Sequence, residues 1–403
     1  MEPDQRERHR GEGHRGWAGV ATLGILTITT YGSWFYGFGV LIGPIHDDVG
    51  WSTTLLGLTY GAAQVITGLG SFVGGRLLDR YGGTGPFGAQ AVFGGGLLLA
   101  ATWADRPALF AVLYAAGAGI TGATGFYHVT TAAAARLRAD RPDKAIAVLT
   151  VIGALCSPIY LPLTAWMVTV WHWRSAARVL ALVAIAGALL ALTLARGGAS
   201  LTQDGPSHSP LAALRGALER QSVRRMLSVY FAAGIAFSSV LVYQVPILTG
   251  AGITLGTAGA IGGLRGFCQI FGRVGLTGAV ERFGAGTLLR TAYLGSAAGV
   301  ALLLVGTIPA GIAYGLIAGA ALGASSPLQA IYARQHFDEA DLGLLMGLQG
   351  AAMGVAGGVG PLVGGVLNDW TDRWSPTIVM ATGTLLLAAY LLSRSSRPEP
   401  APN

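Results

Sequence analysis

Three polar residues, each four positions from the next, interrupt the apolar stretch GGLRGFCQIFGRVG (262–275): Arg265, Gln269 and Arg273. On a continuous α-helix, residues at this spacing lie along one drifting stripe and line the same wall. A charge at the centre of a membrane helix costs about 2.5–3.5 kcal/mol on insertion scales, so each arginine needs water, carbonyl oxygens or an anion. The stretch therefore predicts a polar cavity wall that binds an anion.

Two structural explanations compete with anion binding: a buried ion pair, or side chains that reach the membrane surface. All 19 acidic residues lie in tails, loops or expected helix ends, so none is placed to neutralise a charge at mid-span. Arg273 also precedes Glu281 by about 12 Å of helix, beyond the last turns from which a long side chain reaches the surface. We therefore expect Arg273 and Arg265 to face a cavity.

A single histidine, His128, lies well inside an apolar segment. With Thr121 and Thr124 it forms an i, i+3, i+7 row on a predicted helix. This row suggests proton coupling or a hydrogen bond to substrate; the alternative is a neutral imidazole bonded to a backbone carbonyl. Other polar and aromatic groups either line the same cavity or pack between helices: Tyr31, Trp34, Tyr36, Gln64, Gln244 and Gln329.

Composition sets the class of protein that must position these groups. Hydrophobic residues make up 52% of the 403 residues and charged residues 11%, against about 25% charged in soluble domains. The net charge of +7 does not indicate nucleic-acid binding, because the basic residues are spread over short connectors and ends. No GxSxG, HExxH or Walker A motif is present, and Cys156 and Cys268 have no metal-site spacing. We expect a membrane protein that is not an enzyme and has no cofactor or metal.

Apolar segments of about 20 residues predict membrane-spanning helices. We expect twelve, although short turns within two pairs leave ten or eleven open: 17–43, 53–77, 86–104, 107–135, 144–170, 176–195, 223–249, 256–280, 285–307, 309–333, 342–367 and 375–393.

The distribution of Lys and Arg predicts the orientation. Most of the 26 basic residues fall in the tails and alternate loops, whereas the opposite loops hold only Arg106, Arg174 and Arg373. The positive-inside rule then places both termini in the cytoplasm of a multi-pass inner-membrane protein. The expected organisation is a cytoplasmic tail, a six-helix half, a cytoplasmic linker, a second six-helix half and a short tail: 1–16, 17–195, 196–222, 223–393 and 394–403.

A short repeat relates the two halves. DRYG, starting at Asp79, matches ERFG, which contains Glu281 and Arg282, at an offset of half the chain. Duplicated six-helix halves characterise one large class of transporters.

The stretch GGRLLDRYGG (74–83) resembles the loop signature of the major facilitator superfamily, through Gly75, Asp79, Arg80 and Gly82. The basic pair that usually follows is replaced by Gly83 and Thr84. YGFGVLIGPIHDDVGWS (36–52), GAGITGATGFYHVTTAAAARL (117–137) and WHWR (171–174) are similar to the branch of oxalate/formate antiporters and monocarboxylate transporters.

This resemblance implies the major facilitator fold, an all-α protein of twelve helices in two pseudo-symmetric halves. It implies a carrier for a small organic anion, with protons as a possible coupling ion. In that branch the helix-8 arginine eight positions before the acidic loop residue binds the substrate carboxylate; Arg273 holds that position relative to Glu281. Asp79, Arg80 and the Glu281–Arg282 pair would act in gating.

Oxalate carriers of that branch place a lysine on helix 11, where this chain has Gln349. The difference favours a monocarboxylate substrate, unless Arg265 supplies the second positive charge. Two alternatives stay open: an exporter of a larger, less polar compound, with structural arginines, and a sensor built on an inactive carrier.

The orientation can be tested with single cysteines introduced at Ser207, in the predicted linker, and at Thr371, in a predicted outer loop. In a background without Cys156 and Cys268, an impermeant thiol reagent applied to intact cells should label position 371 and not 207. Labelling of position 207 from outside would contradict the orientation.

Overall fold

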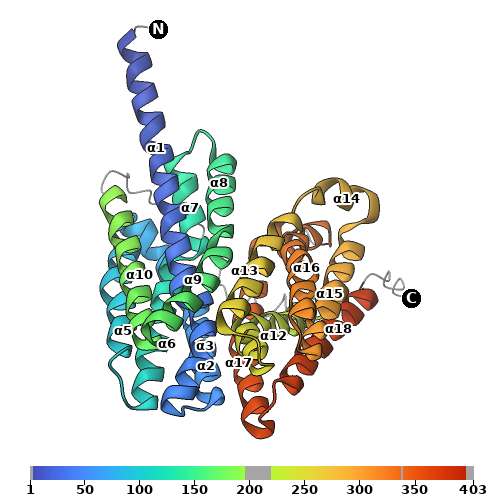
Figure 1. The fold of residues 1–403 in the computed structure, drawn as a ribbon. Helices are drawn as coiled ribbons and strands as arrows, with labels where there is room; N and C mark the ends of the chain where they lie inside the picture. The colour runs from blue at the N-terminus through green and yellow to red at the C-terminus, as the bar shows by residue number, and fades with distance from the viewer. Residues whose placement is uncertain (1–2, 196–218, 337–338, 396–403) are drawn as a thin grey trace, which may run out of the picture.

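The computed structural model describes residues 3–195, 219–336 and 339–395, which form helices and no strand. The helices pack as two bundles that lie side by side (Figure 1). The first bundle contains α1 (Pro3–Thr30), the π-helix η1 (Tyr31–Tyr36), α2 (Gly37–Val49), α3 (Thr53–Tyr81), α4 (Thr84–Ala89), the π-helix η2 (Gln90–Gly94), α5 (Gly95–Ala101), α6 (Pro107–Gly125), α7 (Tyr127–Leu137), α8 (Pro142–Ala154), α9 (Cys156–Trp171) and α10 (Trp173–Ala195). The second contains α12 (Gln221–Gly250), α13 (Leu255–Phe271), α14 (Leu276–Phe283), α15 (Ala285–Ala301), the 3-10 helix η3 (Leu302–Val305), α16 (Ile308–His336), α17 (Glu339–Thr371) and α18 (Ser375–Ser395).

Ten helices of the described residues are long and apolar enough to cross a membrane, and each overlaps one predicted span. The two remaining predicted spans are helical but segmented: 86–104 contains the π-helix η2, and 256–280 contains a turn. The predicted all-α membrane fold is confirmed. Of the predicted linker 196–222 and C-terminal tail 394–403, residues 196–218 and 396–403 lie outside the described part of the chain.

The expectation of one continuous helix over 256–280 is wrong. Helix α13 ends at Phe271, and a turn over residues 272–275 precedes α14. Gly275 has a left-handed φ of 71°, which glycine adopts without strain. A Cβ at Gly272 would lie 1.9 Å from the carbonyl oxygen of Ala320, so α13 packs backbone to backbone against α16 at this point.

The predicted helix 107–135 is also interrupted. Phe126 has an extended conformation, with φ −80° and ψ 170°, so α6 ends at Gly125 and α7 starts at Tyr127. Thr121 and Thr124 therefore do not share a continuous helical face with His128, and the expected row is wrong.

The internal repeat is visible in the backbone. Gly82 ends α3 with φ 60°, and Gly284 ends α14 with φ 78°. Both conformations favour glycine, so each half uses it to turn the chain after its copy of the repeated motif.

The two bundles are joined at the end of the molecule opposite the N-terminus (Figure 1). There Asp369 of α17 accepts hydrogen bonds from the backbone N–H groups of Thr53 and Thr54 at 2.9 and 2.8 Å, and from the Thr53 hydroxyl at 2.6 Å. These N–H groups belong to the first turn of α3, where a helix presents unpaired donors and favours a negative charge. A carboxylate of the second bundle thus caps a helix of the first.

Close backbone approach extends this contact along the same two helices. A Cβ at Gly61 of α3 would lie 2.5 Å from the carbonyl oxygen of Gly358 on α17. Beside it, the hydroxyl of Tyr243 donates a 2.6 Å hydrogen bond to the carbonyl of Pro361. Small residues let membrane helices pack this closely.

Replacing Asp369 with alanine should weaken the closed arrangement at this end, because the cap forms only while α3 and α17 are in contact. Loss of a helix cap costs about 1 kcal/mol, or roughly a fivefold shift in the equilibrium. Spin labels can be attached at positions 47 and 373, in place of Asp47 and Arg373, and the distance between them measured by double electron–electron resonance. In Asp369→Ala a larger fraction of molecules should show the longer distance between the labels.

Asp105→Ala is the matched control, because Asp105 pairs with Arg174 inside the first bundle. An unchanged distance distribution in Asp369→Ala, or an equal shift in the control, would show that the cap does not hold the bundles together.

Candidate functional site

Arg265 is fully buried in α13 and is among the largest buried side chains of the molecule. Its Nε donates a 2.8 Å hydrogen bond to Oε1 of Gln244 on α12. The hydroxyl of Tyr314 on α16 donates to the same oxygen at 3.2 Å. Three helices of the second bundle therefore hold the guanidinium in place through one shared amide oxygen.

The other two nitrogens of Arg265, Nη1 and Nη2, are buried and have no hydrogen-bond partner. None of the ion pairs between described residues involves Arg265. A buried charge whose only partner is a neutral amide is expensive, since the interior does not replace the lost hydration. Nη1 and Nη2 are the two terminal nitrogens of the planar guanidinium. In this geometry they can donate two parallel hydrogen bonds to one carboxylate.

Arg265 lies where the two bundles meet. A Cβ on the next residue, Gly266, would lie 1.9 Å from Oγ of Ser157 on α9, so α13 and α9 touch at this level. The hydroxyls of Tyr36 and Tyr60, both from the first bundle, lie within electrostatic range of the Arg265 charge. The first bundle therefore contributes hydroxyl groups to the region around this cation.

Arg273 lies in the turn after α13 and is exposed. Its Nε is 3.4 Å from the carbonyl oxygen of Gly323, a long hydrogen bond. Its charge also acts on Tyr36 and Tyr127 of the first bundle, so it borders the same region between the bundles. Gln269 is half-buried, and its backbone packs against Gly323 of α16. The expected stripe of three therefore becomes one buried arginine and one exposed arginine.

Gln349 belongs to a polar network inside the second bundle. Its Nε2 donates to Oε1 of Gln329 at 3.0 Å, and Nε2 of Gln329 donates to the hydroxyl of Tyr293 at 2.9 Å. Tyr230 donates to the backbone carbonyl of Gln329 at 3.0 Å. These bonds tie four helices of that bundle together, while Oε1 of Gln349 is buried and has no hydrogen-bond partner.

Tyr31 and Trp34 lie in the π-helix η1 and stack on Phe126. The Tyr31 and Phe126 rings are 3.7 Å apart and parallel within 3°, and Trp34 lies 5.4 Å from Phe126 on a nearly parallel plane. Trp34 is completely buried, and its Nε1 has no hydrogen-bond partner. The extended residue that ends α6 is thus held in place by aromatic packing.

His128 is exposed at the start of α7, and its Nε2 is 3.1 Å from the carbonyl oxygen of Ala123. A carbonyl oxygen only accepts, so this contact assigns the hydrogen to Nε2. Nδ1 then remains as the nitrogen that can take up a proton. The Thr124 hydroxyl does not bond His128 but donates to the carbonyl oxygen of Ile120 at 2.8 Å.

Of the signature residues, Asp79 at the end of α3 forms an ion pair with Arg136 of α7, within the first bundle. Arg80 stacks over Tyr81, and Arg282 over Phe283. Gly75 has open space around it, Gly82 turns the chain, and Glu281 is exposed.

The loop between α7 and α8 adds a further pair at the same end. The guanidinium of Arg138 donates to Asp140 and lowers the pKa of that carboxyl below its ordinary value.

Sequence reasoning did not identify Tyr314 or Asp369. In the sequence Tyr314 lies inside the predicted span 309–333 and Asp369 just beyond the predicted span 342–367, and nothing in their spacing sets them apart. Their partners, Gln244 and Thr53, are 70 and 316 residues away, so only the folded chain brings them together. The structure also shows no group of three or more His, Cys, Asp or Glu side chains placed to hold a metal ion among its described residues.

Comparison with known proteins agrees with this architecture. The sequence model of the Major Facilitator Superfamily matches residues 23–264 and 226–403. A protein of Pseudomonas aeruginosa named transcription regulatory protein OpdE is 29% identical over 407 residues, covering 94% of each chain.

Solved structures share the fold at low identity. The nucleoside transporter NupG superposes with a TM-score of 0.78 at 12% identity, covering 95% of this chain and 99% of that one. The inward-open xylose transporter XylE of E. coli superposes with a TM-score of 0.71 at 16% identity, covering 95% and 96%. With a family match over nearly its whole length and ten apolar helices among its described residues, this chain belongs to the Major Facilitator Superfamily of multi-pass membrane transporters and is not an enzyme.

Proposed function

We propose that this chain is a secondary transporter of a small organic anion of the monocarboxylate type, and that Arg265 binds the substrate carboxylate. The observation that carries the proposal is the pair of buried, unpartnered nitrogens on Arg265. A carboxylate between the two bundles would complete the guanidinium fork and offset the cost of burying it. The resemblance to carriers of monocarboxylates supports the same substrate class.

The charge balance of the site favours one carboxylate over two. Arg265 is the single arginine that is fully buried in the described residues, and its hydrogen-bond partner is a neutral amide. A monoanion would neutralise it, whereas a dianion would leave one buried negative charge uncompensated. Gln349, at the position of the second cation of oxalate carriers, is neutral.

Arg273 takes a different role in this proposal from the one expected from the sequence. Because it is exposed and lies about two turns along the chain from Arg265, we assign it to attracting the anion into the space between the bundles. Asp79 and Arg80 are proposed to act in gating, since they lie at the end of α3 opposite the Asp369 cap.

A site between the two bundles can be opened to one side of the membrane at a time, as alternating access requires. With the Asp369 cap formed, the anion reaches Arg265 from the end that carries the N-terminus, which the basic residues predict to be cytoplasmic. Binding would neutralise the buried charge and thereby lower the cost of enclosing it, which favours the occluded and opposite states.

The name of the Pseudomonas relative favours a second candidate function, a sensor of the same anion. In that case the ligand would bind at Arg265 without being carried across the membrane. Uptake into proteoliposomes separates the two, because a carrier shows flux and counterflow and a sensor shows binding alone.

Arg265→Gln and Arg265→Lys should both lose carboxylate binding, because neither keeps the planar fork in place. Loss of a buried charge contact typically costs 2–5 kcal/mol, roughly 30- to several-thousand-fold in affinity. Binding should be measured on purified protein with a panel of mono- and dicarboxylates, together with nucleosides and sugars.

Arg290→Gln is the matched control, since Arg290 is an exposed arginine of α15. Unchanged carboxylate binding by folded Arg265 variants would refute the anion-carrier proposal and favour the exporter of larger, less polar compounds.

Arg265→Met should have opposite effects on stability and on binding. Removing an uncompensated buried charge is neutral or stabilising, often by about 1–4 kcal/mol, and Gln244 keeps Tyr314 as a partner. The melting temperature without ligand should therefore stay equal or rise while ligand-induced stabilisation disappears. A large fall in the melting temperature would instead identify Arg265 as a structural residue.

His128→Gln should abolish the acceleration of transport by a pH gradient while leaving anion exchange intact, if protons are coupled through the free Nδ1. His46→Gln is the control, because His46 also bonds a backbone carbonyl, that of Trp51, but lies at the opposite end. Uptake at several imposed gradients is the measurement, and an unaltered pH dependence in His128→Gln would remove this residue from the mechanism.

A further inference from the structure

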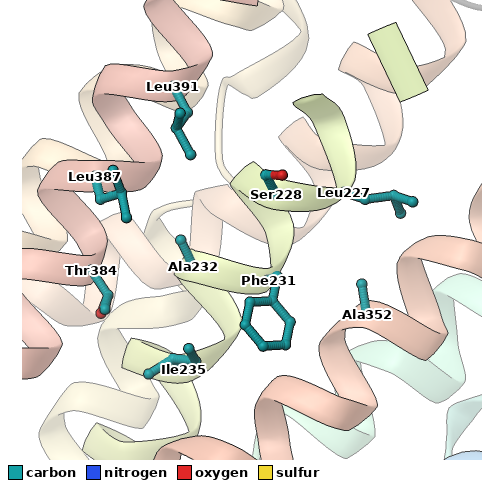
Figure 2. Close-up of a pocket in the computed structure, with 9 residues that line it drawn as sticks. All are labelled: Leu227, Ser228, Phe231, Ala232, Ile235, Ala352, Thr384, Leu387 and Leu391. Carbon is teal, nitrogen blue, oxygen red and sulfur yellow. The ribbon is translucent and has the colours of Figure 1, made fainter. Parts of the chain in front are cut away.

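Helix α12 has different surroundings on its different faces. Toward α17 and α18 it borders a groove of about 460 Å³, whose walls are apolar except for the hydroxyls of Ser228 and Thr384 (Figure 2). Those walls offer an anion no positive partner. Further along α12, Gln244 makes a buried polar contact with α13 and α16. The position of α12 that bears on anion binding is therefore Gln244.

The amide of Gln244 is completely buried and fixed in one orientation. Oε1 accepts from Nε of Arg265 at 2.8 Å and from the hydroxyl of Tyr314 at 3.2 Å, while Nε2 donates to the carbonyl of Leu241 at 3.1 Å. Turned by 180°, the amide would direct its NH2 group at the N–H of Arg265, and two donors would face each other. Gly262 brings α13 close to the same oxygen, because a Cβ there would lie 3.4 Å from Oε1.

This contact determines how a ligand can reach Arg265. A guanidinium can grip a carboxylate with two of its nitrogens, either Nε with one terminal nitrogen or both terminal nitrogens. Because Gln244 occupies Nε, the terminal pair remains, and both of its nitrogens are buried without a hydrogen-bond partner. A carboxylate that binds Arg265 with two hydrogen bonds must therefore approach end-on, along the axis of the side chain.

The neutrality of position 244 matters as much as its hydrogen bond. Glutamate has nearly the same shape as glutamine, and its carboxylate would lie where Oε1 now lies, 2.8 Å from a buried cation. If Arg265 served stability alone, that ion pair would be favourable, since the guanidinium is already removed from water. An amide keeps the hydrogen bond and leaves the positive charge uncompensated.

We propose that Gln244 is a positioning residue for substrate binding: its neutral amide orients Arg265 and keeps the positive charge available for one substrate carboxylate, bound end-on at Nη1 and Nη2. This inference rests on the anion transporter proposed above. It implies that a carboxylate placed at position 244 competes with the substrate for the same cation.

Two variants of the purified full-length protein, Gln244→Glu and Gln244→Met, separate this role from packing. Glutamate keeps an acceptor for Arg265 and adds a counter-ion, whereas methionine removes the acceptor and leaves the charge. Binding is measured with formate, acetate, lactate and pyruvate as probes. Methionine should lower the affinity roughly fivefold, as expected for one hydrogen bond, and glutamate at least about thirtyfold, as expected for a lost charge contact.

Thermal melts without ligand should give the opposite order. Gln244→Glu should melt no lower than the parent, because an ion pair replaces an uncompensated charge and outweighs the lost hydrogen bond to Leu241. Gln244→Met should melt lower than the parent. Gln90→Glu is the matched control: Gln90 is also completely buried, but its amide contacts the hydroxyl of Thr30, so a carboxylate there should lower the melting temperature.

A purely structural role predicts the reverse order of affinities, because glutamate keeps the hydrogen bond that methionine loses. The inference would be overturned if Gln244→Glu bound the acids as well as Gln244→Met does, or melted below it. Should Arg265→Gln lose binding while Gln244→Glu retains it, this inference fails and the proposed function stands. Should the parent bind none of the four acids, or Arg265→Gln bind them like the parent, the proposed function itself fails.

Discussion

The buried guanidinium of Arg265 is the constraint around which the centre of the molecule is arranged. Gln244 and Tyr314 hold it from two helices of its own bundle, and the first bundle contributes neutral hydroxyls. None of these groups carries a compensating charge. The side chain of Arg265 is therefore held in place, but its positive charge has no negative partner. A bundle that needed Arg265 only for stability would gain from replacing it with an apolar side chain.

Two carboxylates at the ends of the bundles, Asp369 and Asp79, have hydrogen-bond or ion-pair partners, whereas Arg265 has no partner of opposite charge. Asp369 caps α3 with three hydrogen bonds, and Asp79 pairs with Arg136. These contacts can form and break with the relative position of the helices at modest cost, because water reaches them when they open. We propose that the two ends set which conformation is populated, while the centre sets what the protein binds.

Breaks in the helices decide which residues reach the centre. The turn at Gly272–Gly275 separates Arg273 from Arg265 and leaves the first exposed and the second buried. The extended Phe126 divides the fourth span and separates His128 from the two threonines. Each break is stabilised by packing across helices: Gly272 lies against the backbone of α16, and Phe126 stacks between Tyr31 and Trp34.

The sequence by itself determined the membrane class, the helical fold and the duplicated motif, and it indicated Arg273 and Arg265 as candidate ligand residues, with Arg273 assigned to the carboxylate. Hydrophobicity, charge distribution and local repeats are properties of the chain, and they need no knowledge of contacts. Which arginine is buried, and the roles of Tyr314 and Asp369, were decided only by tertiary structure. Helix periodicity assumes an unbroken helix, whereas a break depends on backbone packing against residues such as Ala320 that are distant in sequence. The cap on α3 joins positions 316 residues apart, and no local pattern carries that information.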